Sequence, residues 1–208
     1  VIEATSTGDI KSFTVAGAVS VALAKQGSGF AVALAASGSL NEIDADTTAI
    51  LRTSTVNVAD AVTVKASNDS EIIAGAGAVA ISFAAAGQGT AAAVAIGGSF
   101  AVNNIGSDDD NNGVWADIDS SEVTAGDAIT VDAEMLAGIF TLGIGAAGSV
   151  AGSGSGSAFA VSLAGSVGIN KIRNNTRARV RNGSTLTTDD NSGAGVSVSA
   201  YDDSWINS

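Results

Sequence analysis

The chain lacks three residue types altogether. Its 208 residues include no cysteine, no histidine and no proline, and only 4% of them are aromatic. Without histidine or cysteine, the sequence cannot build a Cys–His or Ser–His nucleophile or an ordinary zinc or transition-metal site. Carboxylate chemistry and calcium bound by oxygen ligands remain open. We therefore expect a protein that is not an enzyme and that holds no cofactor other than calcium.

Positive charge is also scarce. Nine Lys and Arg residues stand against 21 Asp and Glu, which gives a formal net charge of -12. Such an acidic surface repels nucleic acid and anionic lipid, so neither is an expected partner. The hydrophobic content of 46% still allows a substantial core and predicts one continuous domain over residues 1–208. No signal peptide is visible at Val1, and we expect the chain to be a piece of a longer protein.

The most apolar stretch, residues 74–102, contains no charged residue. Large apolar residues alternate in it with Ala, Ser and Gly, and this period of two is typical of strands. Gly87-Gln88-Gly89 predicts a turn between two strands. Because both faces are apolar, we expect sheets buried on both sides. Two membrane-spanning helices are the alternative. The six glycines and the absence of a flanking Lys/Arg cluster favour strands and predict no membrane insertion.

Three copies of one unit follow one another along the chain. The motifs AVAL, AVAI and AVSL are each followed, ten residues after their first Ala, by Asn41, Asn103 and Asn170, which are 62 and 67 residues apart. Each unit is expected to hold four strands, in the first copy two apolar ones at 15–23 and 30–40, a third near 49–52 and a fourth near 62–66. The predicted borders are a repeat tail at 1–10 and repeats at 11–72, 73–139 and 140–206.

These repeats predict an all-β, parallel β-solenoid whose units stack in register. A unit of this length can form either one wide coil or three coils of about 20 residues. Two columns of alternating charge favour the wide coil, because stacked strands lie only about 4.8 Å apart and like charges there would repel. The columns are Arg52, Asp119 and Arg181 on the third strand, and Glu3, Lys65 and Asp132 on the fourth.

The same alignment stacks Asn41, Asn103 and Asn170. Stacked amides can form a hydrogen-bonded ladder at the corners of coils. The alternative is that the three are turn residues that favour unusual backbone angles. Either interpretation gives them a structural role.

Two further clusters carry candidate chemistry. Asp108, Asp109 and Asp110 could contribute oxygen ligands to calcium, although they lack the spacing of a known calcium loop, and a solvated acidic loop is the alternative. Asp117 or Asp119 beside Trp115 could line a groove that binds or cleaves polysaccharide. The two carboxylates also fit the charge columns, since Asp117 is equivalent to Arg179 and Asp119 to Arg181 in the next copy, and no cleft unlike the repeats is evident.

The sequence motif of the repeats, A-V-[AS]-[LI] followed by N-x-I and V-T-A-G-D-x-I-T-V, resembles repeats of large bacterial surface proteins. These are the leukotoxin-like filamentous adhesins, the passenger regions of autotransporters and haemagglutinin-like exoproteins. The resemblance implies an extracellular solenoid stalk or filament at a bacterial cell surface. It carries no catalytic residues. We therefore expect a structural segment that associates end to end with further copies of the same repeats, with surface glycans as a second candidate partner.

Overall fold

The computed structural model describes all of residues 1–208 except 45, 108–112, 190–192 and 194. In the described residues, the strands form four parallel sheets, with orders β1-β5-β9-β13, β2-β6-β10, β3-β7-β11 and β4-β8-β12; β14 also pairs with β9. This arrangement confirms the predicted all-β parallel solenoid. No helix in the described part of the chain is long and apolar enough to cross a membrane.

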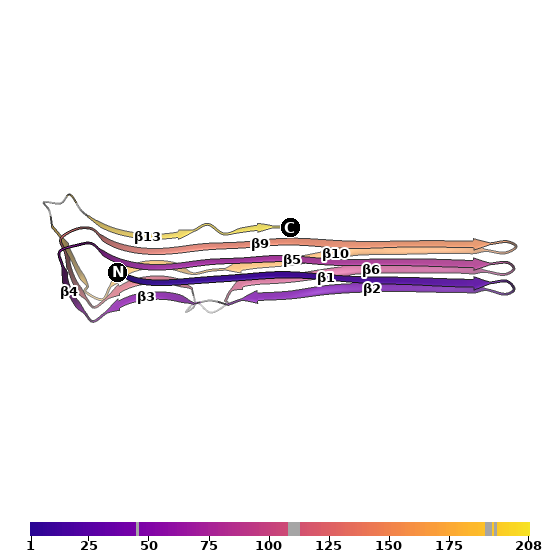
Figure 1. The fold of residues 1–208 in the computed structure, drawn as a ribbon, viewed down its shortest axis with the longest axis horizontal. Helices are drawn as coiled ribbons and strands as arrows, with labels where there is room; N and C mark the ends of the chain where they lie inside the picture. The colour runs from indigo at the N-terminus through magenta and orange to yellow at the C-terminus, as the bar shows by residue number, and fades with distance from the viewer. Residues whose placement is uncertain (45, 108–112, 190–192, 194) are drawn as a thin grey trace.

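Each coil contains one long strand, one return strand and two short strands (Figure 1). Coil 1 consists of β1 (Ile2–Ala24), β2 (Gly29–Ile43), β3 (Thr47–Arg52) and β4 (Thr55–Val58). Coil 2 consists of β5 (Val62–Ala86), β6 (Ala91–Gly106), β7 (Val114–Asp119) and β8 (Glu122–Ala125). Coil 3 consists of β9 (Ile129–Ser153), β10 (Ala158–Arg173), β11 (Thr176–Arg181) and β12 (Thr185–Thr188), and β13 (Val196–Asp202) and β14 (Trp205–Asn207) begin a fourth coil.

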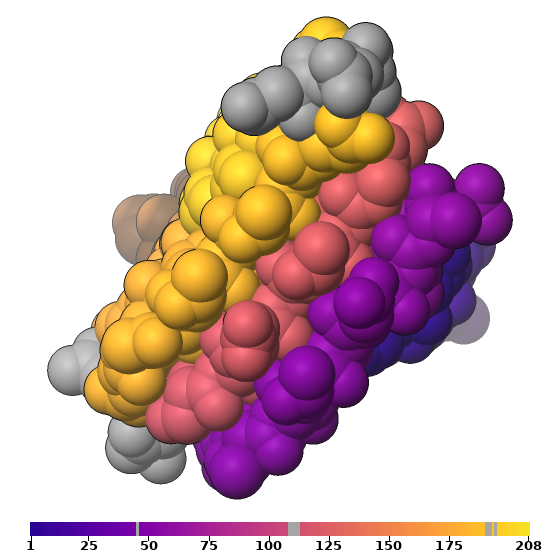
Figure 2. Space-filling view, turned by 90° about the vertical axis from the view of Figure 1, so that its left-hand side faces the viewer, coloured from indigo at the N-terminus to yellow at the C-terminus, as the bar shows by residue number. Residues whose placement is uncertain are grey.

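The register shows one wide coil per repeat. Residues equivalent in sequence are direct neighbours in the sheets: Asn103 pairs with both Asn41 and Asn170, and Asp119 pairs with both Arg52 and Arg181. Three small coils per repeat would separate these residues, so that alternative is wrong. Figure 2 views the end formed by the short strands, where the three coils lie side by side as indigo-purple, pink and yellow bands.

The long strands differ from the predicted ones. The sequence suggested that the strand at 62–66 ends before the apolar strand of the next unit begins. In the structure both belong to β5, which runs for 25 residues without interruption. The borders predicted at 72/73 and 139/140 therefore lie inside β5 and β9.

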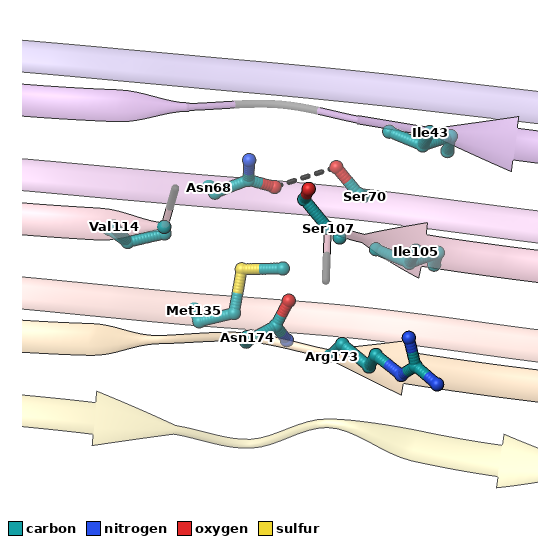
Figure 3. Close-up of a pocket in the computed structure, with 11 residues that line it drawn as sticks. Ile43, Asn68, Ser70, Ile105, Ser107, Val114, Met135, Arg173 and Asn174 are labelled. Atoms are coloured by element: carbon teal, nitrogen blue, oxygen red, sulfur yellow. Dashed lines mark hydrogen bonds between the residues drawn. The ribbon is translucent and has the colours of Figure 1, made fainter. Parts of the chain in front are cut away.

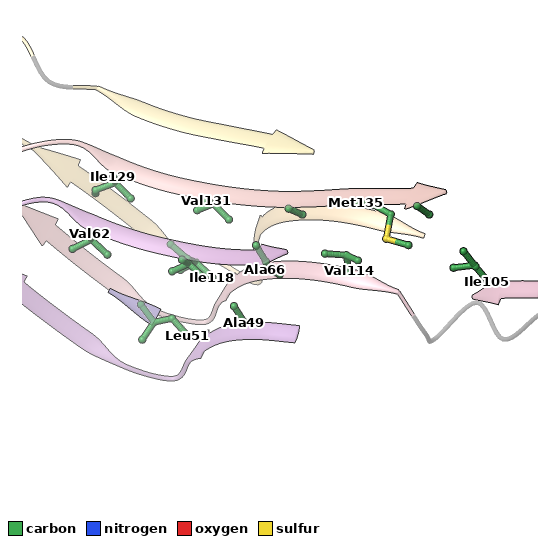
Figure 4. Packing of buried hydrophobic residues seen from close by; sticks show 14 of the residues in the cluster. Ala49, Leu51, Val62, Ala66, Ile105, Val114, Ile118, Ile129, Val131 and Met135 are labelled. Carbon is green, nitrogen blue, oxygen red and sulfur yellow. The ribbon is translucent and has the colours of Figure 1, made fainter. Parts of the chain in front are cut away.

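We divide each coil into an arm and a base. The arm comprises residues 12–40, 74–102 and 141–169, where a long strand and its return strand lie face to face. The base comprises the remaining residues, where the long strand faces the two short strands. Its core is built from large β-branched and other apolar side chains (Figure 4), among them Val64, Ile72, Ile105, Val114, Ile118, Ile129 and Val131.

The arm has the opposite arrangement. Its buried side chains are small, and Ala78, Ala80 and Ala95 are completely covered. Its large apolar side chains point outward, and Phe13 and Val15 are 72% and 83% exposed. The expectation that both faces of these strands are buried is therefore wrong for this chain.

The continuity of β5 explains why the small residues are inside. Along a regular strand, residues of the same parity face the same side. Val64 and Ile72 face the core of the base, so Ala78 and Ala80, at the same parity, must face inward too. The sheets of the arm approach closely as a result: a Cβ added at Gly97 would lie 2.2 Å from the carbonyl oxygen of Ala146.

Candidate functional site: the ladders of the base

A charged column crosses the sheet β3-β7-β11. Asp119 lies between Arg52 and Arg181, with Oδ2 at 3.3 Å from Nε of Arg52 and 3.2 Å from an Nη of Arg181. The order of signs is the one that the sequence indicated. The column ties each coil to the next, because every ion pair joins residues from neighbouring strands.

A second column lies two residues earlier on the same strands. Asp117 is fully buried and accepts two hydrogen bonds from Arg179, from Nε at 2.9 Å and from Nη2 at 2.8 Å. Arg181 adds a third contact to Asp117 at 3.3 Å. Bidentate pairing of this kind is strong and geometrically specific. The carboxylate of Asp117 is therefore held by coil 3 and is not open to solvent.

Local contacts shift the pKa of two groups in these columns. The hydrogen bond donated by Asn182 to Oδ1 of Asp119, at 2.6 Å, is the main cause of a lowered pKa of Asp119. Burial acts in the opposite direction, and the hydrogen bond from Ser120 and the charges of Arg181 and Arg52 add to the lowering of the pKa. The hydrogen bond with Asp117 raises the pKa of Arg179. These contacts therefore favour the charged forms of Asp119 and Arg179.

Trp115 lies beside the second of these columns and is half-buried. The guanidinium groups of Arg177 and Arg179 lie 5.3 and 5.4 Å from the centre of its ring. Its Nε1 donates a hydrogen bond of 3.0 Å to the carbonyl oxygen of Asn175. The contacts are cation–π and hydrogen-bonding interactions within the stack. The ring is thus a packing group between coils 2 and 3.

The charged column on the long strands is also formed, with one difference. Glu3, Lys65, Asp132 and Ser199 are neighbours in register. The Nζ of Lys65, however, lies nearer to Oε2 of Glu134, at 3.0 Å, than to Oδ2 of Asp132, at 3.8 Å. The hydrogen bond with Glu134 is the main cause of a raised pKa of Lys65. Glu134 is not at the position equivalent to Lys65, so an alignment of equivalent residues does not reveal this contact.

The three asparagines form the expected amide ladder, but not at a corner. Asn41 donates to Asn103 at 2.7 Å, and Asn103 donates to Asn170 at 2.8 Å. Asn103 lies inside β6, fully buried between the two sheets, where Thr141 of β9 also hydrogen-bonds to Asn103 and Asn170. The ladder therefore joins the two sheets as well as the three coils. The turn-residue alternative is wrong for Asn103.

The corner position is taken by serines, which the sequence analysis did not single out. The backbone N–H groups of Ser54 and Ser121 each donate a hydrogen bond to the hydroxyl oxygen of the serine one coil further on, at 3.1 Å. The residue before each serine, Thr53, Ser120 or Gly183 in the third coil, has a positive φ. The recurrence of a serine at 54, 121 and 184 was the signal that could have revealed this column.

A small cavity lies in the base, beside the ends of the return strands β2, β6 and β10 (Figure 3). It is lined by side chains that include Asn68, Ser70, Ile105 and Met135, and Asn68 accepts a hydrogen bond of 2.6 Å from Ser70. The cavity leaves about 10 Å³, which is the space of at most one water molecule. It is too small for an organic substrate.

Asp108, Asp109 and Asp110, the candidate calcium ligands, lie outside the described residues. Within the described part of the chain, no group of three or more Asp or Glu residues is placed to hold a metal ion. The calcium hypothesis stays a prediction from the sequence.

Comparisons of the chain with protein-family models, with curated proteins and with solved structures return no match. A proposal for the function of the chain therefore rests on its fold and on the side-chain ladders.

Proposed function

We propose that the chain is a structural segment of a β-solenoid stalk that grows by the addition of coils at its two open edges. The stalk would belong to an extracellular filament or adhesin at a bacterial surface. The observation that supports the proposal is the register: four sheets run parallel through three coils, and β13 and β14 already begin a fourth. The extracellular placement rests on the repeat resemblance alone.

The two edges have complementary hydrogen-bonding groups. The inward-facing residues Gly29 and Thr47 donate their N–H groups to coil 2, at 2.9 Å in both cases. Alternate residues of a strand point to opposite neighbours. The free N–H groups at the coil 1 edge therefore belong to outward-facing residues, and those at the coil 3 edge to inward-facing residues. One edge thus fits the other, as in any pair of adjacent coils.

Separate copies of the chain meet two obstacles to end-to-end stacking. β13 and β14 occupy the edge of β9 on which β1 of the next copy would stack. The third sheet would also place Arg181 of one copy beside Arg52 of the next, and like charges there repel. We therefore propose that coils are added chiefly within one continuous chain, and end-to-end association of copies is the alternative outcome of the test.

The test is a tandem chain that joins residues 1–196 to a complete second copy. Val196 is equivalent to Val62, and Val1 to Thr63, so this junction continues the register of β5. Arg52→Gln in the second copy removes the like-charge contact. We expect one cooperative unfolding transition at a higher urea midpoint than that of the single chain, because each added interface contributes stability. Small-angle scattering should show the stack longer by about 14 Å, three coil spacings.

The matched control joins residues 1–197 to the same second copy. This shift of one residue moves every following side chain to the opposite face. We expect this control to unfold at the midpoint of the single chain. If the two tandem chains unfold alike, growth by stacking in register is wrong.

The polysaccharide alternative has weaker support. It needs an accessible carboxylate beside an accessible ring, whereas Asp117 is buried in ion pairs and Trp115 lies under two guanidinium groups. We do not propose it.

A further inference from the structure

One outer surface of the arm is apolar throughout. It is formed by the outward-facing residues of β1, β5 and β9 within the arm, and we call it the arm face. Large exposed side chains on it include Phe13, Val15, Val19, Phe83, Leu142 and Ile144. Lys25, at the tip, is the only charged residue in the arm. Monomeric proteins rarely expose contiguous apolar patches of more than a few hundred Å², so the arm face indicates a partner.

The arm face is not flat. An apolar groove of about 160 Å³ lies over Gly75 and Gly77 of coil 2. Its walls are Phe13 and Val15 from coil 1 and Leu142 and Ile144 from coil 3. Further along the same strand, toward the tip, Val79, Ile81 and Phe83 are large outward side chains, 36 to 42% exposed, and we call this row the ridge. Groove and ridge thus lie on one strand, on either side of Val79.

We propose that a second copy of the chain packs on the arm face, antiparallel, about a two-fold axis that passes beside Val79. Residues equally distant from Val79 then face each other, so Ile81 of each copy lies opposite Gly77 of the other, and Phe83 lies opposite Gly75 and the ring of Phe13 that covers it. Ile81 of each copy therefore enters the groove of the other at Gly77, and Phe83 packs on Phe13. This is the self-complementarity that a two-fold interface requires.

The same axis sets the contacts of the neighbouring coils. It brings large apolar side chains together at Val15 and Val19 of coil 1 and at Leu142 and Val150 of coil 3. In coil 3, Ile144 lies opposite Gly148, a large residue against a glycine. In coil 1, Asp9, at the border with the base, lies opposite Lys25 at the tip of the partner, so charges of opposite sign meet where the apolar surface ends.

The size of the arm face fits a dimer. Eleven residues along the strands and three strands across give about 36 Å by 14 Å, hence about 500 Å² per copy and about 1,000 Å² in total. This reaches the lower limit for a specific interface. A lipid bilayer is a poorer partner, because the open edges of coils 1 and 3 would leave backbone groups unpaired in hydrocarbon.

The opposite surface of the arm, formed by β2, β6 and β10, serves as the control. There the ring of Phe100 lies across Gly38, since a Cβ at Gly38 would be 2.2 Å from its Cζ. On the arm face Phe13 covers Gly75 in a similar way, with Cδ1 2.7 Å from a Cβ at that position, so Gly77 is the open part of the groove and Gly98 is its match on the opposite surface. The two surfaces allow matched substitutions.

The first measurement is the mass of the chain by sedimentation velocity, from low to high micromolar concentration. We expect a dimer of the 20.1 kDa chain. Gly77→Leu places a side chain in the groove and should weaken the dimer by at least about tenfold. Gly98→Leu, on the opposite surface, should leave it unchanged. A Cβ has room at both positions, with the nearest atom at 4.0 Å in each case, so both variants should keep the fold in circular dichroism.

A second measurement locates the axis. The chain has no cysteine, so Val79→Cys introduces a single thiol that would face its symmetry mate. A short bis-maleimide should join two Val79→Cys chains and should not join two Ile96→Cys chains, which carry the thiol on the opposite surface. A monomer at every concentration would overturn the proposal, as would loss of the dimer in Gly98→Leu. Flotation of a monomer with phosphatidylcholine vesicles would overturn it in favour of lipid.

Discussion

The base and the arm are built from the same long strands, but the base buries large side chains and the arm buries small ones. In the base, β5 points Val64 and Ile72 inward and Lys65 and Glu71 outward. In the arm, the same strand points Ala78 and Ala80 inward and Val79 and Ile81 outward. Inward parity is constant along the strand, so the difference lies only in which parity carries the large residues. The residue pattern of the arm alone therefore does not show which face points inward. The preceding residues of the same strand, in the base, are needed as well.

The two regions must differ in what stabilises them. Burial of a side chain such as Val or Ile contributes about 1.5 to 3 kcal/mol. The buried alanines of the arm contribute far less free energy through burial. The arm therefore depends more on backbone hydrogen bonds within each sheet and on hydrogen bonds between the sheets. Ser82, for example, donates a hydrogen bond of 2.9 Å to the carbonyl oxygen of Ala31 in the opposite sheet. We expect the base to hold most of the free energy of unfolding.

The largest effect should come from a cavity in the base. Ile118 is fully buried, and Ile118→Ala should lower the free energy of unfolding by about 2 to 5 kcal/mol, because the removed atoms leave a void. Ile96→Ala, at a residue 38% exposed on the arm, should change it by about 0.5 kcal/mol or less. Urea unfolding followed by circular dichroism checks both. Equal losses in the two variants would show that the outward residues of the arm are buried in solution.

The fold was predictable because two independent signals agree. The period of two indicated strands, and the repeat spacing placed Asn41, Asn103 and Asn170 in register. The charge signs at Arg52, Asp119 and Arg181 then selected the wide coil, because only direct neighbours need alternating charge.

Which face of the arm strands points inward was harder to predict from the sequence. Both parities of 74–102 are apolar, so hydrophobicity alone does not decide which faces inward, and large residues would normally be assigned to the core. The decisive information lay in the residues just before this stretch, in the parity of Val64 and Ile72. Glu134 was missed for another reason: its contact with Lys65 is diagonal, and a column of equivalent residues does not include it.

A smaller effect should come from overfilling the arm. Ala80 is fully buried between sheets that pack through alanines, so Ala80→Leu should cost about 1 to 3 kcal/mol through strain. Ala85→Leu, on the outward face of the same strand, is the matched control and should cost little. Amide hydrogen exchange locates the effect: exchange should rise within the arm and stay unchanged in the base. A rise in the base as well would mean that the two regions unfold as one unit.

The smallest effect should be a response to pH that is confined to the base. The pKa of Asp119 lies below its ordinary value of 3.8, chiefly because of the hydrogen bond from Asn182. The unfolded chain therefore takes up this proton at higher pH than the folded chain does, and stability falls as the pH drops below about 3.8. Asp119→Asn removes this contribution, so its urea midpoint should fall less steeply than that of the wild type below that pH. Between pH 5 and 7 the two curves should run parallel, because Asp119 is charged in both states there. Curves that stay parallel down to pH 3 would mean that the column around Asp119 does not hold the coils together in solution, and the contrast between a charged base and an arm with a single charge would then have no electrostatic consequence.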